Sequence, residues 1–250
     1  MIIGKGLLAR AFEPRFGKDS DVIVFASGVS NSLETRSQEF AREETLLRQL
    51  LDGEVKRFIY FGSCGVTSSE SEFTPYMRHK RAMESLVLAA PHGLVLRLPQ
   101  VVGRTDNPHT LTNFLRNRIV SGAHFTVWTH AERNLIDIDD VVRVGSWLAT
   151  ELPVEATTVS IAATCSLLMP RIVGIFERVL DRVANCSYVE KGTPMIIDTH
   201  MVESLITRLG IDLGEGYIER IIDKYYAADR CSDISEPSLP VASSTWTTAS

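Results

Sequence analysis

A tyrosine and a lysine four residues apart are the residues of this chain best placed to do chemistry. Tyr76 and Lys80 form a Tyr-x-x-x-Lys pattern, and on a helix such residues share one face about 6 Å apart. A lysine cation there would stabilise the tyrosinate and lower the pKa of the phenol from about 10. This tyrosine could exchange a proton with a carbonyl or alcohol while a cofactor moves a hydride. The alternative is a half-buried tyrosine beside a solvated lysine.

Ser63 and a glycine-rich turn are two further candidate parts of an active site. Ser63 precedes Tyr76 at the end of an expected strand, where its hydroxyl could orient the same substrate oxygen or simply begin a turn. Residues 4–9 read Gly-Lys-Gly-Leu-Leu-Ala and fit G-x-G-x-x-A between a strand and a helix. Glycines in that position let the backbone approach a pyrophosphate at a helix N-terminus.

Alternating strands and helices would position these residues. We expect buried strands at 1–3, 21–26, 57–61 and 93–98, separated by helices at 7–12, 35–51 and 74–90. Thr74 and Pro75 are a helix-start signal. This order predicts βαβ units and a mainly parallel sheet. Ligands bind such sheets at the carboxyl ends of the strands, here at 4–9, 26–31, 62–67 and 99–103.

The second half of the chain has weaker signals. Helices are expected at 111–120, 139–148, 167–183, 201–209 and 217–226, with Asp139 as a cap. Short strands or apolar segments are expected at 124–128, 134–138, 157–162, 187–190 and 195–197. We predict a core at 1–150, a small lobe at 151–228, and a flexible tail at 229–250 that is rich in Ser, Thr and Pro. A polar loop is expected at 68–73.

Composition excludes several classes of protein. The chain has 250 residues, of which 44% are hydrophobic and 23% charged, as in ordinary globular proteins. A net charge of -5 argues against a dedicated nucleic-acid surface. There is neither an apolar run long enough for a membrane span nor a signal-peptide pattern. The four cysteines form no CxxC pair, which favours reduced thiols over a disulfide frame or metal site. We therefore expect a cytoplasmic protein without nucleic-acid or membrane partners.

Taken together, these features resemble the short-chain dehydrogenase/reductase superfamily. The resemblance is closest to its extended branch of nucleotide-sugar epimerases, dehydratases and reductases. Supporting stretches follow in the expected order at 58–66, 74–84, 96–103 and 133–141, so the resemblance covers roughly residues 1–145. It implies an α/β fold, with a Rossmann-like doubly wound, mainly parallel sheet and a small C-terminal α/β lobe.

The resemblance also implies a role for each matching residue. Tyr76 would be the acid/base, Lys80 would hold the nicotinamide ribose and tune Tyr76, and Ser63 would complete the triad. The other residues implied to bind the cofactor, NAD or NADP, are Gly4, Lys5, Gly6, Leu7, Leu8, Ala26, Ser27, Gly28 and Pro99. Those implied to bind a nucleotide sugar are Gln100, Asn113 and Arg133.

Cys64 and His109 are candidates for a more specialised role. One group of epimerase–reductases in this branch places a cysteine and a histidine in these two regions, as acid and base on the sugar carbons. Here Cys64 follows Ser63 directly, one residue closer than in that group. The alternatives are a small buried apolar residue for Cys64 and a solvated loop residue for His109.

The chain departs from the family pattern near its start. The interval between Ala9 and the strand at 21–26 is too short for the usual second and third strands. Their loss would also remove the acidic residue that binds the adenine ribose in the family, so the choice between NAD and NADP is not predicted.

The function implied by the resemblance is an NAD(P)-dependent epimerase, dehydratase or reductase acting on a nucleotide-activated sugar. By analogy, such an enzyme would supply sugars for polysaccharide biosynthesis. A homodimer through the helices at 35–51 and 74–90 would also match the family. The alternative is a non-catalytic dinucleotide-binding or regulatory protein of the same fold, which the missing adenine-side strands favour.

Overall fold

The larger part of the molecule is built on a parallel sheet. The computed structural model describes residues 1–67 and 73–231. Five strands lie in the order β1-β2-β3-β4-β9, and every neighbouring pair is parallel. They are β1 (Ile2–Ile3), β2 (Val22–Phe25), β3 (Arg57–Ser63), β4 (Gly93–Leu98) and β9 (Thr157–Ser160). The predicted mainly parallel α/β sheet is confirmed.

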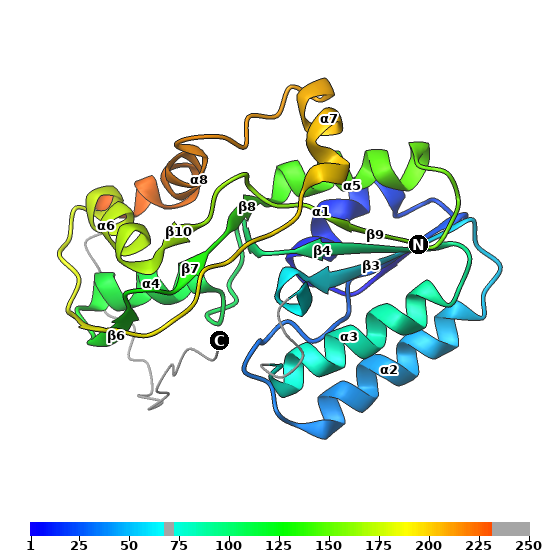
Figure 1. The fold of residues 1–250 in the computed structure, drawn as a ribbon, viewed down its shortest axis with the longest axis horizontal. Helices are drawn as coiled ribbons and strands as arrows, with labels where there is room; N and C mark the ends of the chain where they lie inside the picture. Colours follow the sequence, from blue (N-terminus) through cyan, green and yellow to red (C-terminus); the bar gives the residue numbers. More distant parts are fainter. Residues whose placement is uncertain (68–72, 232–250) are drawn as a thin grey trace.

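Helices cover both faces of this sheet. Helices α2 (Ser37–Leu51) and α3 (Pro75–Leu88) lie on one face, and α1 (Leu7–Phe16) and α5 (Ile138–Glu151) lie on the other (Figure 1). Side chains alternate along β3, so that Phe58 and Tyr60 pack with α2 and α3 whereas Ile59 and Phe61 join the opposite core. Burial on both faces explains why these strands are nearly continuous apolar runs.

The predicted shortening of the sheet is also confirmed. Helix α1 leads directly into β2, and β1 pairs with β2 through Ile2 opposite Val24. Within the described residues, β1 has no neighbour on its other side and forms the edge of the sheet. The Met1 ammonium donates hydrogen bonds to the carbonyl oxygens of Phe16, Asp19 and Val22, which ties this edge to the α1–β2 turn.

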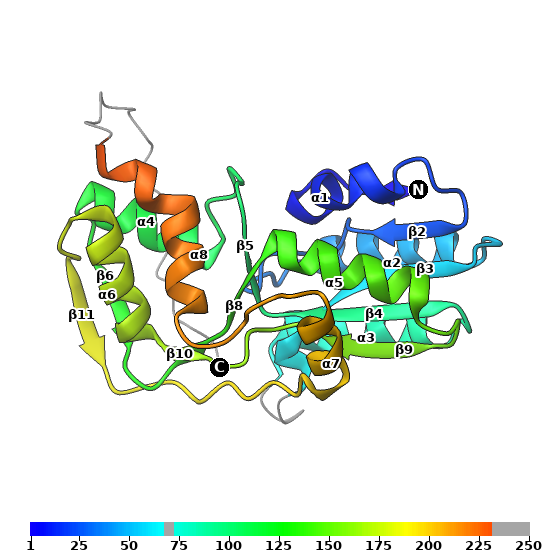
Figure 2. The same ribbon diagram turned by 90° about the horizontal axis from the view of Figure 1, so that it is seen from above.

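A smaller lobe extends from the carboxyl ends of the strands (Figure 2). Its helices are α4 (Leu111–Ser121), α6 (Met169–Leu180) and α8 (Tyr217–Tyr226). Its short strands pair as β5 (Gln100–Val102) with β8 (Leu135–Asp137), β6 (Phe125–Trp128) with β11 (Cys186–Val189), and β7 (Glu132–Arg133) with β10 (Leu167–Leu168). The first two pairs are parallel and the third is antiparallel.

The two parts are interleaved along the chain, which differs from the predicted boundary at residue 150. Strand β9 follows that boundary but belongs to the large sheet, and α7 (His200–Arg208) contacts β9 and α5. Conversely, α4 and β6 precede the boundary but pack with α6 and β11. Sequence periodicity locates elements but does not reveal which sheet a short strand joins.

Two local predictions need correction. The expected helix at 167–183 begins with strand β10 and ends at Leu180. No strand forms at 195–197, because the backbone of Met195 bonds to the side chains of Glu132 and Ser166 instead of a neighbouring strand. The expected loop at 68–73 and tail at 229–250 lie largely outside the described residues. None of the described helices combines the length and apolar character needed to cross a membrane.

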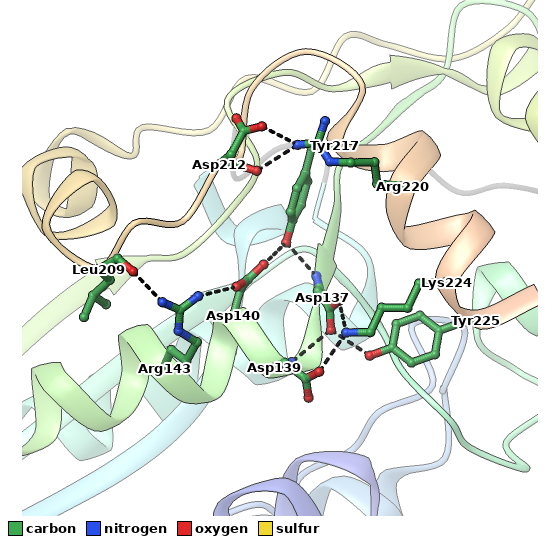
Figure 3. Close-up of polar contacts among 10 residues, drawn as sticks. All are labelled: Asp137, Asp139, Asp140, Arg143, Leu209, Asp212, Tyr217, Arg220, Lys224 and Tyr225. Atoms are coloured by element: carbon green, nitrogen blue, oxygen red, sulfur yellow. Dashed lines mark hydrogen bonds and ion pairs between the residues drawn. The ribbon is translucent and has the colours of Figure 1, made fainter.

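A polar network joins the lobe helix α8 to the start of α5 (Figure 3). Asp137 caps α5 by accepting the Asp139 N–H, so Asp137 and not Asp139 is the N-cap. Its carboxylate also accepts hydrogen bonds from Lys224 Nζ at 2.6 Å and the Tyr225 hydroxyl at 2.7 Å. Tyr217 bridges the Asp137 N–H and the Asp140 carboxylate. These contacts fix the lobe beside the strand ends.

Candidate functional site

A cleft of about 640 Å³ lies at the carboxyl ends of the strands, between the sheet and the lobe. That volume is in the range of small-molecule sites. It brings together most of the residues predicted from the sequence, which are Gly4, Lys5, Gly6, Leu7, Leu8, Ala26, Ser27, Gly28, Ser63, Cys64, Tyr76, Lys80, Pro99, Gln100, His109 and Arg133.

The glycine turn lines the cleft. Gly4 has a φ of +132°, and a β-carbon there would lie 2.4 Å from the Ala26 carbonyl oxygen. Only glycine therefore fits where β1 and β2 end side by side. Gly6 occupies the N-cap position of α1, and no side chain forms a capping hydrogen bond there. A β-carbon at Gly6 would lie in open space. The free N–H groups at the start of α1 can therefore face an anion in the cleft.

Tyr76 enters the cleft from the first turn of α3. Thr74 caps this helix by accepting the Met77 N–H at 3.2 Å, and Pro75 occupies its first turn, as predicted. The predicted lowering of the Tyr76 pKa is wrong for this structure. Burial raises that pKa, the negative charge of Glu43 raises it further, and interaction with the Ser63 side chain only partly opposes them.

Lys80 is a buried cation, not a solvated surface lysine. It is 3% exposed, and its Nζ lies 3.0 Å from the Tyr60 hydroxyl, 3.3 Å from Glu43 Oε1 and 3.4 Å from the Phe61 carbonyl oxygen. Burial lowers the pKa of Lys80, and the neighbouring Glu43 carboxylate opposes that shift. The charge that was expected to stabilise a tyrosinate is thus balanced by Glu43.

Glu43 is fully buried on α2 and has several partners. Its carboxylate accepts hydrogen bonds from the Val29 N–H at 2.6 Å and the Tyr60 hydroxyl at 2.7 Å, and it lies 3.0 Å from His79 Nε2. Burial acts to raise the pKa of Glu43, but its contact with His79, the Lys80 charge and its other hydrogen bonds outweigh this and lower it to about 2. The carboxylate is therefore held ionised inside the protein.

This lowered pKa predicts a specific acid sensitivity. Glu43 stabilises the fold fully above its unfolded pKa near 4.5, and this stabilisation disappears as the pH falls to about 2. Unfolding free energies measured by urea titration from pH 5 to pH 2 should fall by up to about 3 kcal/mol through this group. Glu43→Gln should be less stable at pH 5 and should lose less stability on acidification. Parallel curves for the two proteins would contradict this assignment.

A second buried carboxylate supports Ser63. Glu84 Oε1 accepts a hydrogen bond from the Ser63 N–H at 3.4 Å, and Glu84 Oε2 accepts one from Arg97 Nη2 at 2.7 Å. Gly62 leaves room for this contact, because a β-carbon there would lie 2.2 Å from Glu84 Oε1. Helix α3, through Glu84, therefore holds the end of β3 in place.

Cys64 and His109 line the same cleft but differ in their surroundings. Cys64 is 2% exposed, and burial raises the pKa of its thiol to about 12. His109 is exposed on the loop before α4, where its backbone N–H bonds to Asn107 Oδ1 at 3.0 Å. A neutral thiol at this position can donate a proton but is not a ready base.

Of the three predicted substrate residues, Asn113 is absent from the cleft lining. Its amide nitrogen bonds to the carbonyl oxygens of Thr105 and Asn107, and its oxygen accepts the Tyr226 hydroxyl. Arg133 lines the cleft and donates to the Glu132 carbonyl oxygen at 2.7 Å. Burial lowers the pKa of Arg133, and no described carboxylate lies within ion-pair distance of it. Its guanidinium is thus available to an anionic ligand.

The cluster of Glu43, Tyr60 and His79 around Lys80 was not predicted. One sequence signal could have located Glu43, because it shares a helical spacing with Phe40 and Leu47 and so interrupts the apolar face of α2. A charged residue on an apolar helix face indicates a buried partner. Tyr60 and His79 carried no comparable signal, since each fits a buried strand or helix position.

Comparisons with known proteins agree with this geometry. The model of the NAD dependent epimerase/dehydratase family matches residues 13–162. A search of curated proteins gave no match. Similar solved structures include UDP-glucuronic acid 4-epimerase from Bacillus cereus, in complex with UDP-glucuronic acid and NAD, at 15% identity and a TM-score of 0.67, covering 89% of this chain and 77% of that one.

Two further structures have the same fold. UDP-glucose 4-epimerase from Thermotoga maritima, with UDP-glucose, is 17% identical with a TM-score of 0.65 and covers 84% of this chain and 76% of that one. RMD from Pseudomonas aeruginosa, complexed with NADPH, is 17% identical with a TM-score of 0.63 and covers 85% and 82%. The family match spans more than half of the sequence, and the chain belongs to the NAD dependent epimerase/dehydratase family.

Proposed function

We propose that this protein is an NAD(P)-dependent enzyme that epimerises, dehydrates or reduces a nucleotide-activated sugar. The observation that carries the proposal is that Ser63, Tyr76 and Lys80 line one cleft together with the glycine turn of the sheet and with Arg133 from strand β7 of the lobe. This arrangement suits a ligand pair in which a dinucleotide lies against the turn and a sugar nucleotide lies toward the lobe.

The residues present fit a dinucleotide at the glycine turn. Gly4 and Gly6 keep side chains away from the start of α1, where backbone N–H groups can bind a pyrophosphate. Ala26, Ser27 and Gly28 continue this wall from the end of β2. Bound nicotinamide supplies the hydride chemistry that these side chains cannot.

In this proposal each catalytic side chain has one task. Tyr76 exchanges a proton with the sugar oxygen at its phenolic hydroxyl, and Ser63 holds that oxygen by a hydrogen bond. Lys80 contributes a fixed positive charge beneath them. Arg133 pairs with the diphosphate of the sugar nucleotide, for which its uncompensated guanidinium is suited. Cys64 and His109 act on the sugar ring only if the reaction includes epimerisation next to a carbonyl.

The solved neighbours support the same classes of ligand. The Bacillus cereus epimerase binds NAD and UDP-glucuronic acid, the Thermotoga maritima enzyme binds UDP-glucose, and the Pseudomonas aeruginosa protein binds NADPH. Because these proteins differ in both cofactor and sugar, they support the class of reaction but not a particular substrate.

Titration of the purified protein with NAD⁺, NADH, NADP⁺ and NADPH tests the proposal most directly. Calorimetry should detect binding of one oxidised and reduced pair, and UDP-, GDP- or dTDP-sugars should then be screened for turnover with that pair. No binding up to millimolar concentration, with and without these sugars, would exclude the enzyme proposal. That result would favour a non-catalytic protein, consistent with the missing strands beside β1.

Two glycine variants separate cofactor binding from folding. Gly6→Ala adds a methyl group in open space, so its melting temperature should match the wild type while dinucleotide affinity falls about tenfold or more. Gly4→Ala forces a β-carbon against the Ala26 carbonyl oxygen at a positive φ and should lower the melting temperature as well. Unchanged affinity in a folded Gly6→Ala variant would place the dinucleotide elsewhere.

A further inference from the structure

We propose that Glu43 is a positioning residue that holds the Lys80 ammonium charged and fixed beneath the cleft. The inference rests on the proposed function for its catalytic meaning, but the contact itself can be tested without any turnover. Glu43 comes from α2 and Lys80 from α3, so the pair also joins the two helices that cover one face of the sheet.

The ammonium of Lys80 has three hydrogen atoms, and the protein supplies three acceptors. Glu43 Oε1, the Tyr60 hydroxyl and the Phe61 carbonyl oxygen all lie within 3.4 Å of Nζ. These three acceptors therefore fix the position of the Lys80 ammonium before any ligand binds.

Glu43 is itself held rigidly, which a positioning residue requires. Its second oxygen, Oε2, accepts the Val29 N–H and contacts His79 Nε2, while Oε1 serves Tyr60 and Lys80. The His79 ring stacks on Phe40 with centroids 4.6 Å apart. The titratable groups around the ammonium are Glu43 from α2, Tyr60 from β3, and Tyr76, His79 and Glu84 from α3.

Gly28 shows where this pair meets the cleft. A β-carbon at Gly28 would lie 2.7 Å from Lys80 Nζ and 2.9 Å from Glu43 Oε1. The pair therefore lies directly beneath the backbone that walls the proposed dinucleotide site. Because Gly28 has no side chain, the Lys80 ammonium can lie directly against this part of the cleft wall.

Glu43 also favours the charged form of Lys80. A lysine that is 3% exposed would lose its proton readily, because burial disfavours the charged form. The Glu43 carboxylate reverses part of that penalty. Without it, Lys80 would become a neutral amine at a lower pH, and its direction would be set by Tyr60 and Phe61 alone.

The test is NMR of the lysine side-chain ammonium in ¹⁵N-labelled full-length protein, with the Lys80 signal identified by its loss in Lys80→Arg. In the wild type, a hydrogen-bonded and buried ammonium should give a slowly exchanging signal that persists into the alkaline range. In Glu43→Gln the signal should disappear at a pH at least about one unit lower. Glu44→Gln is the matched control, because Glu44 is 42% exposed and pairs with Arg48 on the surface of the same helix.

Each outcome decides between the interpretations. Absence of a slowly exchanging Lys80 signal in the wild type would overturn the proposal even if Glu43→Gln fails to fold. An unchanged Lys80 titration in a folded Glu43→Gln variant would also overturn it. If the signal shifts as expected but neither protein binds a dinucleotide, the Glu43–Lys80 contact stands and the proposed function fails. If the wild type binds one, Glu43→Gln should bind it about tenfold more weakly, as expected for loss of one charged hydrogen-bond partner.

Discussion

Replacing Tyr76 by phenylalanine should lower kcat by about 10²- to 10⁴-fold, the usual contribution of one positioned acid or base. The phenol is the only group we assign to move a proton at the sugar oxygen, and the phenylalanine ring keeps the packing at the start of α3. Because burial and the charge of Glu43 raise the Tyr76 pKa, the group is a neutral phenol near pH 7 and acts first as a proton donor. The rate of reduction of a keto-sugar should therefore show no loss through ionisation of this phenol across the neutral range.

The measurement is steady-state turnover together with dinucleotide affinity for the same variant. Affinity should change little, because Ser63, Lys80 and the glycine turn remain. Tyr188→Phe is the control, since Tyr188 is 55% exposed on β11, and it should turn over like the wild type. Wild-type kcat in Tyr76→Phe would refute the assigned role and mean that another group moves the proton.

The sequence predicts the cleft well where chemistry depends on spacing along the chain. Tyr76 and Lys80 share a helix, so four residues suffice to bring them to one face. Ser63 ends a parallel strand, and the ends of parallel strands meet at one edge of the sheet. The missing strands were also predictable, because the interval after Ala9 is too short to contain them.

Spacing along the chain predicts much less about contacts between distant elements. Burial raises the pKa of Tyr76, and Glu43 from another helix, which balances the charge on Lys80, raises it further, so the expected lowering does not occur. Asn113 lies on the expected helix, yet its amide holds the loop at 105–107 instead of lining the cleft. For both Lys80 and Asn113, the sequence predicts the helix correctly. The partner of each side chain depends on tertiary packing, which the periodicity of the sequence does not encode.

Arg57 illustrates the same limit at the opposite end of β3 from Ser63. It is 1% exposed and donates to four carbonyl oxygens around the end of α5, namely those of Ala149 at 3.4 Å, Leu152 at 2.6 Å, Pro153 at 3.0 Å and Glu155 at 3.4 Å. The last carbonyl groups of a helix have no partners within it, and a cation there also interacts favourably with the helix dipole. Arg57 thus ties the C-terminus of α5 and the turn into β9 to the first residue of β3.

Arg57→Met should therefore lower the free energy of unfolding by about 4 kcal/mol, since it retains the apolar stem but leaves several buried carbonyl oxygens without a donor. Urea unfolding would measure this loss. Arg48→Met is the matched control, because Arg48 is 58% exposed and bonds to Glu44 on the surface, and it should change stability by less than about 1 kcal/mol. Equal midpoints for the two variants would contradict the role of Arg57.

Below its melting transition, Arg57→Met should keep the wild-type dinucleotide affinity, because the lost contacts lie at the far end of the strand from the cleft. Stability and ligand binding at the two ends of β3 would then be separable, although one strand carries both.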